Sequence, residues 1–303
     1  MLLVVCPNLA IDRILQVSHL KTGTVQRSRQ ALVQPGGKGS NVARVFRQLG
    51  GDVVLVGFLG SRNAECVVEP MRRAGIHVDA IEAYEETRTC TIVCEPNPDS
   101  HPTVINEESP QVEPAAVAAL LKKVDRWIAR ADGVLATGSL SMGVPVELYA
   151  EVLDRGRCRG KISAIDATGA ALRTGLTVRP NFMKPNTAEM RELFEAATIS
   201  VLAAHTAFTF GKTGAVVLHE GQCLYAAPPR IFTANPVGAG DAFNAGYLKS
   251  LLERRPAVDC LRLALAAAAS DAGTLRPGWI DVSQVVSLAA EVEPRFTPAA
   301  SAE

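Results

Sequence analysis

The sequence lacks the features that mark several large classes of protein. It has no excess charge, because 31 Lys and Arg residues balance 31 Asp and Glu residues, and no Lys/Arg run is longer than two. A nucleic-acid-binding protein usually carries a basic surface, so neither DNA nor RNA is an expected partner. No apolar run reaches the roughly 18 residues that a membrane span needs, and the start of the chain has no basic region of a signal peptide. We therefore expect a cytoplasmic protein without membrane contact.

The sequence also has few residues of the kinds that hold disulfides or metals. Its seven cysteines are odd in number and scattered, and the closest pair, Cys90 and Cys94, lacks zinc-site spacing. The five histidines are isolated from one another along the chain. These patterns exclude a disulfide framework, and they give little support to a zinc site or a Ser-His-Asp triad. The cysteines are typical of small buried side chains in a reducing compartment.

What the sequence does contain is an alternation of strands and helices along 303 residues. Short apolar runs predict buried strands at residues 1–6, 53–57, 133–137, 161–166 and 215–218. Apolar residues at three- and four-residue spacing predict helices over 114–131 and 241–252, the first of them opened by Pro114. This alternation predicts an α/β protein with a mostly parallel central sheet that carries helices on both faces.

Two segments, 12–35 and 87–107, depart from this pattern because they contain β-formers without helical periodicity. In the second, residues 89–95 and 103–106 flank a Pro- and Asn-rich stretch that is typical of a hairpin. We interpret the two segments as a small antiparallel β-sheet, inserted as a lid without its own linker. The main α/β domain would then comprise residues 1–11, 36–86 and 108–296, and residues 297–303 would form a loose tail.

Two glycine-rich segments resemble nucleotide-binding motifs but fail them. Residues 210–213 end like a Walker A loop, yet the position of its first glycine holds Thr206. The run Gly238-Ala239-Gly240 begins like a dinucleotide fingerprint, yet its third glycine position holds Phe243. Neither a P-loop nor an NAD site is predicted.

The run Gly238-Ala239-Gly240-Asp241 has a different chemical logic. Small residues at the start of a helix leave backbone amides free to bind an anion, assisted by the positive end of the helix dipole. A carboxylate beside such a site is suited to accept a proton from a hydroxyl that attacks a phosphoryl group. The alternative is an ordinary helix start in which Asp241 is only a favourable first-turn charge.

A second glycine cluster, residues 34–43, again places bare backbone at the start of a helix, which is predicted to run to Leu49. Gly36 and Gly37 would let a polyhydroxylated ligand lie against the backbone. Asn41 would bind a hydroxyl, and Lys38 would meet a phosphate. Alone, this cluster is also compatible with a common glycine-rich helix start.

Together and in this order, the two clusters resemble the PfkB family of ribokinase-like sugar kinases. Further matches are Pro7-Asn8-Leu9-Ala10-Ile11-Asp12 and the Asn-x-x-Glu motif in residues 184–189, and the resemblance extends from Leu2 to about Gly278. It implies a ribokinase-like three-layer α/β/α fold. Local stretches such as Glu86-Thr87-Arg88-Thr89 and Asp166-Ala167-Thr168-Gly169 resemble the branch that phosphorylates fructose-1-phosphate, fructose-6-phosphate or tagatose-6-phosphate.

The resemblance implies a role for each matching residue. Asp241 would be the general base, with an anion hole from Gly238, Ala239 and Gly240. The substrate would be held by Asp12, Gly36, Gly37, Lys38, Asn41, Arg88, Ser139 and Arg27. ATP would face Lys184, Asn186, Thr209, Gly211 and Gly214, and Mg²⁺ would be organised through water by Glu189 and Asp166. Three of these roles have alternatives: Arg88 as a solvated residue, Arg29 in place of Arg27, and Asp166 as a strand end.

The sequence departs from the family pattern at several points. Ser141-Met142 replaces a usual Pro-Pro, Ala170 replaces a commonly acidic residue, and only 19 residues separate Glu189 from Thr209. The last departure predicts a shortened or missing helix beside the nucleotide site. Two alternatives to a ketohexose-phosphate kinase therefore stay open: a kinase for an unphosphorylated sugar or nucleoside, and a catalytically impaired sugar-phosphate sensor.

The lid segments also carry a prediction about assembly. Cys90, Ile92 and Cys94 alternate along one strand, so their side chains should share one apolar face. A small sheet with an exposed apolar face is marginal in water, and pairing with a second copy would bury it. We expect a homodimer joined through the lids.

Overall fold

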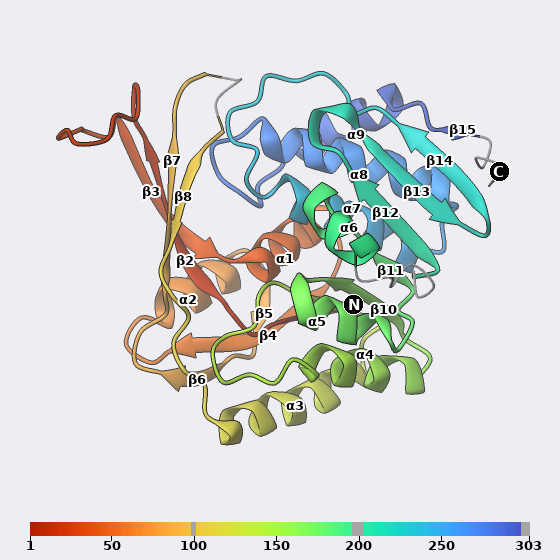
Figure 1. Ribbon diagram of the computed structural model, residues 1–303, viewed down its shortest axis with the longest axis horizontal. Coiled ribbons are helices and arrows are strands. Elements are labelled where there is room, and N and C mark those ends of the chain that lie inside the picture. The colour runs from red at the N-terminus through yellow and green to blue at the C-terminus, as the bar shows by residue number, and fades with distance from the viewer. Residues whose placement is uncertain (98–100, 196–202, 298–303) are drawn as a thin grey trace.

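A computed structural model describes residues 1–97, 101–195 and 203–297 (Figure 1). Its large sheet is centred on β1 (Leu2–Cys6), which lies between β4 (Val53–Gly60) and β9 (Gly133–Thr137). Beyond β4 lie β5 (His77–Val78) and β6 (Ile81–Tyr84). Beyond β9 follow, in order, β10 (Ile162–Asp166), β11 (Phe182–Met183), β12 (His205–Thr209), β13 (Ala215–His219), β14 (Gln222–Ala226) and β15 (Arg295–Thr297).

The strands from β5 and β6 across to β12 are parallel, and only the three pairs from β12 to β15 are antiparallel. The mostly parallel sheet predicted from the sequence is therefore confirmed. The chain leaves β1 toward β4 on one side and returns to β9 on the other. Such a reversal of strand order opens a crevice at the carboxyl ends of the strands, where open α/β sheets bind ligands.

Helices cover both faces of this sheet, which completes the expected three layers (Figure 1). One layer packs against one core cluster and contains α1 (Lys38–Gln48), α2 (Glu65–Arg73), α7 (Ala239–Leu252), α8 (Ala257–Ala272) and α9 (Val282–Glu291). The other layer contains α3 (Pro114–Ile128), α4 (Leu148–Cys158), α5 (Gly169–Leu176) and α6 (Thr187–Glu195). No helix of the described residues is long and apolar enough to cross a membrane.

A separate four-stranded sheet takes its strands from the two segments that lacked helical periodicity. Its order is β3 (Gln30–Gly36), β2 (Ala10–Gln16), β7 (Thr89–Cys94) and β8 (Thr103–Asn106). We call it the small sheet. The predicted hairpin of β7 and β8 is antiparallel, although residues 98–100 of its turn lie outside the described residues. The prediction of a fully antiparallel sheet is wrong, because β2 and β7 run parallel.

The structure corrects two further expectations. Thr297 is not part of a loose tail, since β15 pairs Arg295–Thr297 with β14; residues 298–303 lie outside the described part. The apolar face of β7 does not point to solvent. Ile92 and Cys94 pack with Ile14 of β2, and Leu32, Val237 and Leu275 of the same chain cover them. That face is therefore not free to pair with a second copy.

The predicted shortening between Glu189 and Thr209 falls partly outside the described residues. Helix α6 begins within the Asn-x-x-Glu motif, and β12 begins at His205. Residues 196–202, which join these two elements, are outside the described part.

Candidate active site

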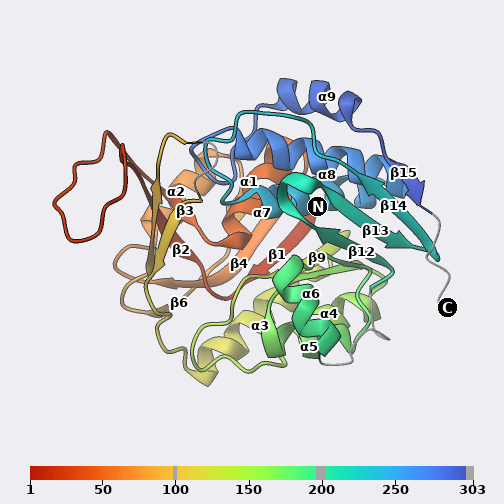
Figure 2. The same ribbon diagram turned by 45° about the horizontal axis from the view of Figure 1, so that its top comes forward.

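A cavity of about 1160 Å³ lies at the carboxyl ends of the central strands, between the small sheet and the start of α7. Sixteen of the predicted site residues line it: Asp12, Gly37, Lys38, Asn41, Arg88, Ser139, Asp166, Lys184, Asn186, Thr209, Gly211, Gly214, Gly238, Ala239, Gly240 and Asp241. Three do not, namely Gly36, Glu189 and Arg27. Gly36 directly precedes the lining residue Gly37, and Glu189 Oε1 lies 3.9 Å from Nζ of the lining residue Lys38. Arg27 is exposed in the loop between β2 and β3, which extends away from the rest of the molecule (Figure 2).

The start of α7 forms the floor of the cavity. Gly238 caps the helix with a φ of 95°, and no side chain caps the first turn. A Cβ at this position would lie 2.8 Å from Pro277 Cβ and 2.9 Å from Asp271 Oδ2, so the turn requires glycine. The amide of Ala239 donates to Pro236, whereas no backbone carbonyl of the described residues accepts from Gly238 or Gly240. The free amides beside the cavity are therefore those of the two glycines.

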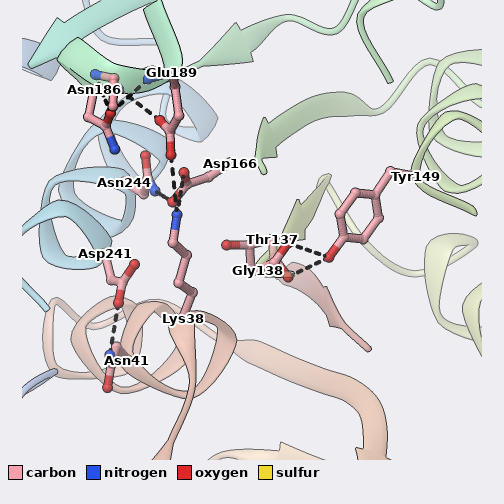
Figure 3. Close-up of polar contacts among 11 residues, drawn as sticks. Lys38, Asn41, Thr137, Gly138, Tyr149, Asp166, Asn186, Glu189, Asp241 and Asn244 are labelled. Atoms are coloured by element: carbon pink, nitrogen blue, oxygen red, sulfur yellow. Dashed lines mark hydrogen bonds and ion pairs between the residues drawn. The ribbon is translucent and has the colours of Figure 1, made fainter. Parts of the chain in front are cut away.

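Asp241 lies in the first turn of α7 and is only 6% exposed. Its Oδ2 accepts a hydrogen bond of 2.8 Å from Nδ2 of Asn41 on α1 (Figure 3). Burial raises the pKa of Asp241 to about 7, with a further increase from Asp166, although Lys38, Lys184 and the Asn41 hydrogen bond oppose the shift. A carboxyl group with a pKa near neutrality is suited to accept a proton and to release it again.

Lys38, the first residue of α1, points into a group of carboxylates (Figure 3). Its Nζ lies 3.0 Å from Asp166 Oδ1 and 3.9 Å from Glu189 Oε1. Burial alone would lower the pKa of Lys38, but Asp166, Asp241 and Glu189 outweigh it and the pKa is raised. Burial likewise opposes ionisation of Asp166, yet Lys38 and Lys184 keep its pKa below the ordinary value. The Lys38 ammonium group therefore pairs with Asp166 and Glu189, the two residues predicted to organise Mg²⁺. It does not pair with a residue predicted to hold the sugar.

Asp166 is the last residue of β10, and its second carboxylate oxygen, which does not face Lys38, also accepts a hydrogen bond. Asn244 on α7 donates 2.7 Å from Nδ2 to Asp166 Oδ2. Asn244 lies three residues after Asp241, so the two side chains share one face of the helix. The sequence interpretation missed Asn244, although this spacing could have identified it.

The Asn-x-x-Glu motif forms the start of α6. Asn186 Oδ1 accepts from the amides of Ala188 (2.9 Å) and Glu189 (3.0 Å), and Glu189 Oε2 accepts from the Asn186 amide (2.8 Å). This is the reciprocal arrangement of a capping box. The remaining oxygen, Oε1, faces Lys38. Burial raises the pKa of Glu189, and Asp166 raises it further.

The other end of the cavity lies against the small sheet. Asp12 on β2 is buried, which raises its pKa to about 6 in spite of nearby Arg44 and Arg88. The Arg88 Nη2 makes one long contact, 3.4 Å to the carbonyl of Asn8, and its buried Nε has no partner among the described residues. Guanidinium groups have five donors that suit planar oxyanions. This end of the cavity therefore holds a cation with donors to spare.

Asn8 and the segment after β9 form the wall between the two ends. Asn8 Nδ2 donates to Ser139 Oγ at 2.8 Å and to Ser109 Oγ at 2.5 Å. The Tyr149 hydroxyl lies within 3.0 Å of the carbonyls of Thr137 and Gly138, which fixes the backbone before Ser139. The sequence interpretation quoted Asn8 in a motif but assigned it no role.

The wall beyond the start of α7 is less polar. It is lined by residues of two segments that carried no motif: Pro228, Pro229, Arg230, Ile231, Thr233, Leu265, Ala268, Ala269 and Ala272. Thr209, Gly211 and Gly214 adjoin this wall, and Lys184 Nζ lies 3.4 Å from where a Cβ on Gly240 would stand. Such a wall could accept a flat apolar group next to the free glycine amides.

Residues 1–274 match the family described as pfkB family carbohydrate kinases. This range includes all the residues that line the cavity. The chain belongs to this family. As a pfkB carbohydrate kinase it is an enzyme, and the family uses ATP and a sugar substrate. The resemblance inferred from the glycine clusters is thereby confirmed.

Solved structures of similar proteins support the same fold. A Thermotoga maritima protein described as a possible 1-phosphofructokinase has a TM-score of 0.87 at 19% identity, covering 98% of this chain and 99% of that one. Escherichia coli phosphofructokinase-2, in complex with substrates and products, has a TM-score of 0.84 at 19% identity, covering 96% and 98%. Arabidopsis thaliana ribokinase with ribose and ATP has a TM-score of 0.72 at 19% identity, covering 95% and 98%. The ribokinase-like fold is therefore established for this pfkB kinase.

Proposed function

We propose that this carbohydrate kinase transfers the γ-phosphoryl group of ATP to a hydroxyl of a ketohexose phosphate: fructose-1-phosphate, fructose-6-phosphate or tagatose-6-phosphate. The observation that carries this proposal is the pair of cations at opposite ends of one cavity. Lys38 lies beside Asp241, whereas Arg88 lies beside Asp12 with unused donors. Two separate cations suit two separate phosphate groups, one on each substrate.

In the proposed reaction, Asp241 accepts the proton of the attacking sugar hydroxyl. The sugar oxygen forms a bond to the γ-phosphorus, and the bond from that phosphorus to the oxygen bridging to the β-phosphate breaks, which releases ADP. The amides of Gly238 and Gly240, with the positive end of α7, stabilise the charge on the migrating group. Asp12 and Asn41 hold sugar hydroxyls, and Ser139 flanks them on the wall next to Asn8.

Lys38 takes a role different from the one expected from the sequence. Because its ammonium group lies between Asp166 and Glu189, we assign it to the transferred phosphoryl group rather than to the phosphate of the sugar. Arg88 alone then binds the sugar phosphate, and exposed Arg27 contributes nothing to the site. ATP extends from Lys184 and Asn186 along Thr209, Gly211 and Gly214 toward the apolar wall.

The donor chemistry of this region fits Mg²⁺. The described residues contain no cluster of three metal-ligating side chains, but Asp166 and Glu189 present carboxylate oxygens beside the phosphoryl position. Mg²⁺ in kinases usually keeps several waters and binds through one or two carboxylates and substrate phosphates. When bound, it would neutralise phosphate charge, with Asp166 and Glu189 holding it through water.

The small sheet is proposed to act as a lid, because it carries Asp12 and its β7 face adjoins the cavity. Segments 12–35 and 87–107 would then move against a main domain formed by the rest of the chain. A lid would exclude water, which otherwise competes with the sugar for the phosphoryl group.

The outward face of the small sheet supports a homodimer. Val33, Arg13, Thr91 and Ile105 form one row across β3, β2, β7 and β8, and Val33 and Ile105 are 64% and 61% exposed. We propose that a second copy covers this face instead of the face that carries Ile92. Sedimentation equilibrium of Ile105→Lys should show loss of a dimer that wild type and the exposed control Val286→Lys retain. A wild-type monomer at micromolar concentration would reject the proposal.

A coupled assay of ADP release tests the substrate class. The three ketohexose phosphates should support turnover, while the corresponding free sugars and nucleosides should not. Arg88→Ala should raise KM for the sugar phosphate about tenfold or more, with KM for ATP nearly unchanged, and Arg27→Ala should match wild type. Turnover of a free sugar that Arg88→Ala leaves intact would favour the alternative kinase. Binding of the sugar phosphate without ADP release under any condition would favour the sensor.

A further inference from the structure

Arg44 is a buried charged residue that none of the motifs includes. It lies on α1 one turn after Asn41 and is only 3% exposed. Its Nη1 donates 2.7 Å to the carbonyl of Pro35, and its Nη2 donates 2.6 Å to Asn41 Oδ1 and 2.8 Å to the carbonyl of Pro277. These contacts join the end of β3, the first turns of α1 and the segment after α8.

The contact with Asn41 determines which way its side-chain amide points. A guanidinium group has only donors, so the Asn41 atom that faces Arg44 has to be the oxygen. Nδ2 then faces the other way, where it donates 2.8 Å to Asp241 Oδ2. In the flipped orientation, the amide oxygen would face a carboxylate and the NH₂ group would face Arg44. Both contacts would be repulsive.

We propose that Arg44 is a positioning residue for phosphoryl transfer, acting through the Asn41 amide to give Asp241 a donor on Oδ2 and leave Oδ1 free for the sugar hydroxyl. This inference rests on the proposed role of Asp241 as the base. Arg44 does not itself line the cavity, and of the three residues whose oxygen atoms accept its hydrogen bonds, only Asn41 does, so its effect on the reaction passes through Asn41.

The acceptors of Arg44 also connect Asp241 with the small sheet. The carbonyl of Pro277 accepts a second hydrogen bond, 2.9 Å from Nε2 of Gln34 on β3. Gln34 is paired with Asp12 in the β2–β3 register. The guanidinium group is thus anchored by the same carbonyl that anchors a strand of the proposed lid. The orientation of Asn41 depends on contacts from both parts of the molecule.

Gln48, one turn further along α1, offers a matched control. It binds the same turn, donating 2.9 Å to the carbonyl of Gly278 and accepting 3.1 Å from the amide of Ile280. It also donates 3.0 Å to the backbone carbonyl of Arg44, but it contacts neither the guanidinium group nor Asn41. Gln48→Met therefore loosens the attachment of α1 to residues 277–280 and leaves the Asn41 amide alone. If Arg44 affected the reaction only by holding residues 277–280 in place, Gln48→Met should lower the activity in the same way.

A pH profile of a variant at Arg44 has to be interpreted against all charges near Asp241. These come from α1, β1, β10, the segment after β11 and α8: Lys38, Arg44, Cys6, Asp166, Lys184 and Asp271. Removing Arg44 also removes a positive charge, which by itself makes Asp241 harder to ionise. A double-mutant cycle with Asn41 separates the two effects, because the charge acts whether or not Asn41 is present.

The experiment compares Arg44→Met, Asn41→Ala, the double variant and Gln48→Met in steady-state kinetics from pH 5.5 to 9, with fructose-6-phosphate, fructose-1-phosphate and tagatose-6-phosphate. We expect Arg44→Met to lower kcat about 10- to 100-fold and to move the acid limb of kcat upward by about one pH unit. In the Asn41→Ala background the same substitution should have less than about a threefold effect. Gln48→Met should keep the wild-type profile.

An Arg44→Met effect of equal size in both backgrounds would overturn the inference, as would a Gln48→Met profile that matches it. If Arg44→Met does not fold, Arg44→Lys enters the same cycle, since one ammonium cannot serve three acceptors in the geometry of the fork. In the wild-type protein, the ¹⁵N side-chain amide signal of Asn41 should titrate with the midpoint of the acid limb, and a signal that does not titrate would overturn the inference without any variant at Arg44.

The variant Asp241→Asn distinguishes failure of the proposed base from failure of the proposed role of Arg44. If this variant is active, the proposed base is wrong, whereas if it is inactive and the cycle is additive, only the role of Arg44 is wrong.

Discussion

Helices α1 and α7 both begin at a glycine with positive φ, but their first turns carry opposite charges. Gly37 (φ 82°) precedes Lys38, and Gly238 (φ 95°) lies three residues before Asp241. Neither helix has a side-chain cap, whereas Asn186 caps α6 and Asp281 caps α9. Other helices, such as α3 and α8, also lack a side-chain cap, but the starts of α1 and α7 line the cavity, where a ligand can reach their first amides.

The charge of Asp241 at the start of α7 is explained by the helix itself, whereas the charge of Lys38 at the start of α1 is explained by contacts with other elements. An acid in a first turn interacts favourably with the helix dipole, so Asp241 would be acceptable in any helix. Lys38 is unfavourable there, and it is compensated by Asp166, Asp241 and Glu189 from other elements. The lysine is therefore the stronger sign of function, because local helix physics gives no reason for it. Asp241 becomes unusual only through burial, which raises its pKa.

The largest expected effect comes from removing the charge at the start of α7. Asp241→Asn should keep the fold and lower kcat by about 10²–10⁴, the usual contribution of a general base. Asp281→Asn, which removes an acid from the start of α9, should leave kcat unchanged. The proposed base role would be rejected by an Asp241→Asn variant that keeps more than half of the wild-type kcat.

The next effect comes from removing the charge at the start of α1. Lys38→Met should lower kcat/KM for ATP about 10- to 100-fold, the usual size for loss of a charge-assisted contact with a phosphate. KM for the sugar phosphate should change little. The exposed Lys122→Met serves as the control. An increase confined to KM for the sugar phosphate would return Lys38 to the role expected from the sequence.

Changing the pH tests the α7 charge without a substitution. Since Asp241 with a pKa of about 7 must be deprotonated to act, kcat should fall about tenfold for each pH unit below 7. The raised pKa also means that the folded state binds this proton more tightly than the unfolded state. The unfolding free energy should therefore fall as the pH rises from the ordinary value of 3.8 toward 7, and Asp241→Asn should lack this component. A rate independent of pH between 5.5 and 7 would contradict the assignment.

The smallest effect separates the two glycines. All glycine-to-alanine changes at positive φ carry a backbone cost, which Gly160→Ala measures alone because no atom lies within 4 Å of its Cβ position. At Gly37 a Cβ would lie 3.3 Å from its nearest atom, the carbonyl oxygen of Asn8, so Gly37→Ala should lose little more unfolding free energy than Gly160→Ala. Gly238→Ala meets Pro277 at 2.8 Å and should lose about 1 kcal/mol more in urea unfolding. Equal losses at Gly37 and Gly238 would mean that the turn at Gly238 relaxes freely.

Local patterns in the sequence predicted the parts of the fold that depend on neighbours in the chain. Strands β1, β4, β9, β10 and β13 of the central sheet, the helix from Pro114 and the β7–β8 hairpin all follow from apolar runs, periodicity or turn composition. The parallel pairing of β2 with β7 joins segments about eighty residues apart, and no local pattern records it. Alternation placed Cys90, Ile92 and Cys94 on one face, but only the structure shows that residues such as Val237 cover that face.

The candidate site follows the same division. Residues within motifs, such as Asp241 and Lys38, were predicted because glycine-rich helix starts have a recognisable composition. Arg44 and the apolar wall around Ile231 and Leu265 were missed, since they reach the site by packing between distant elements. Arg27 lies in an exposed loop and does not line the cavity, and a loop residue has no periodicity that fixes where it points.

The boundary between the small sheet and the main body has a mechanical consequence. Strand β3 ends at Gly36 and helix α1 starts at Lys38, so a single residue, Gly37, separates them. With no flexible stretch in between, a tilt of the small sheet has to rotate the chain at Gly37. The rotation acts directly on the first amides of α1 and on the lysine that follows. If the small sheet closes as proposed, the same movement would therefore also reorient the Lys38 ammonium group.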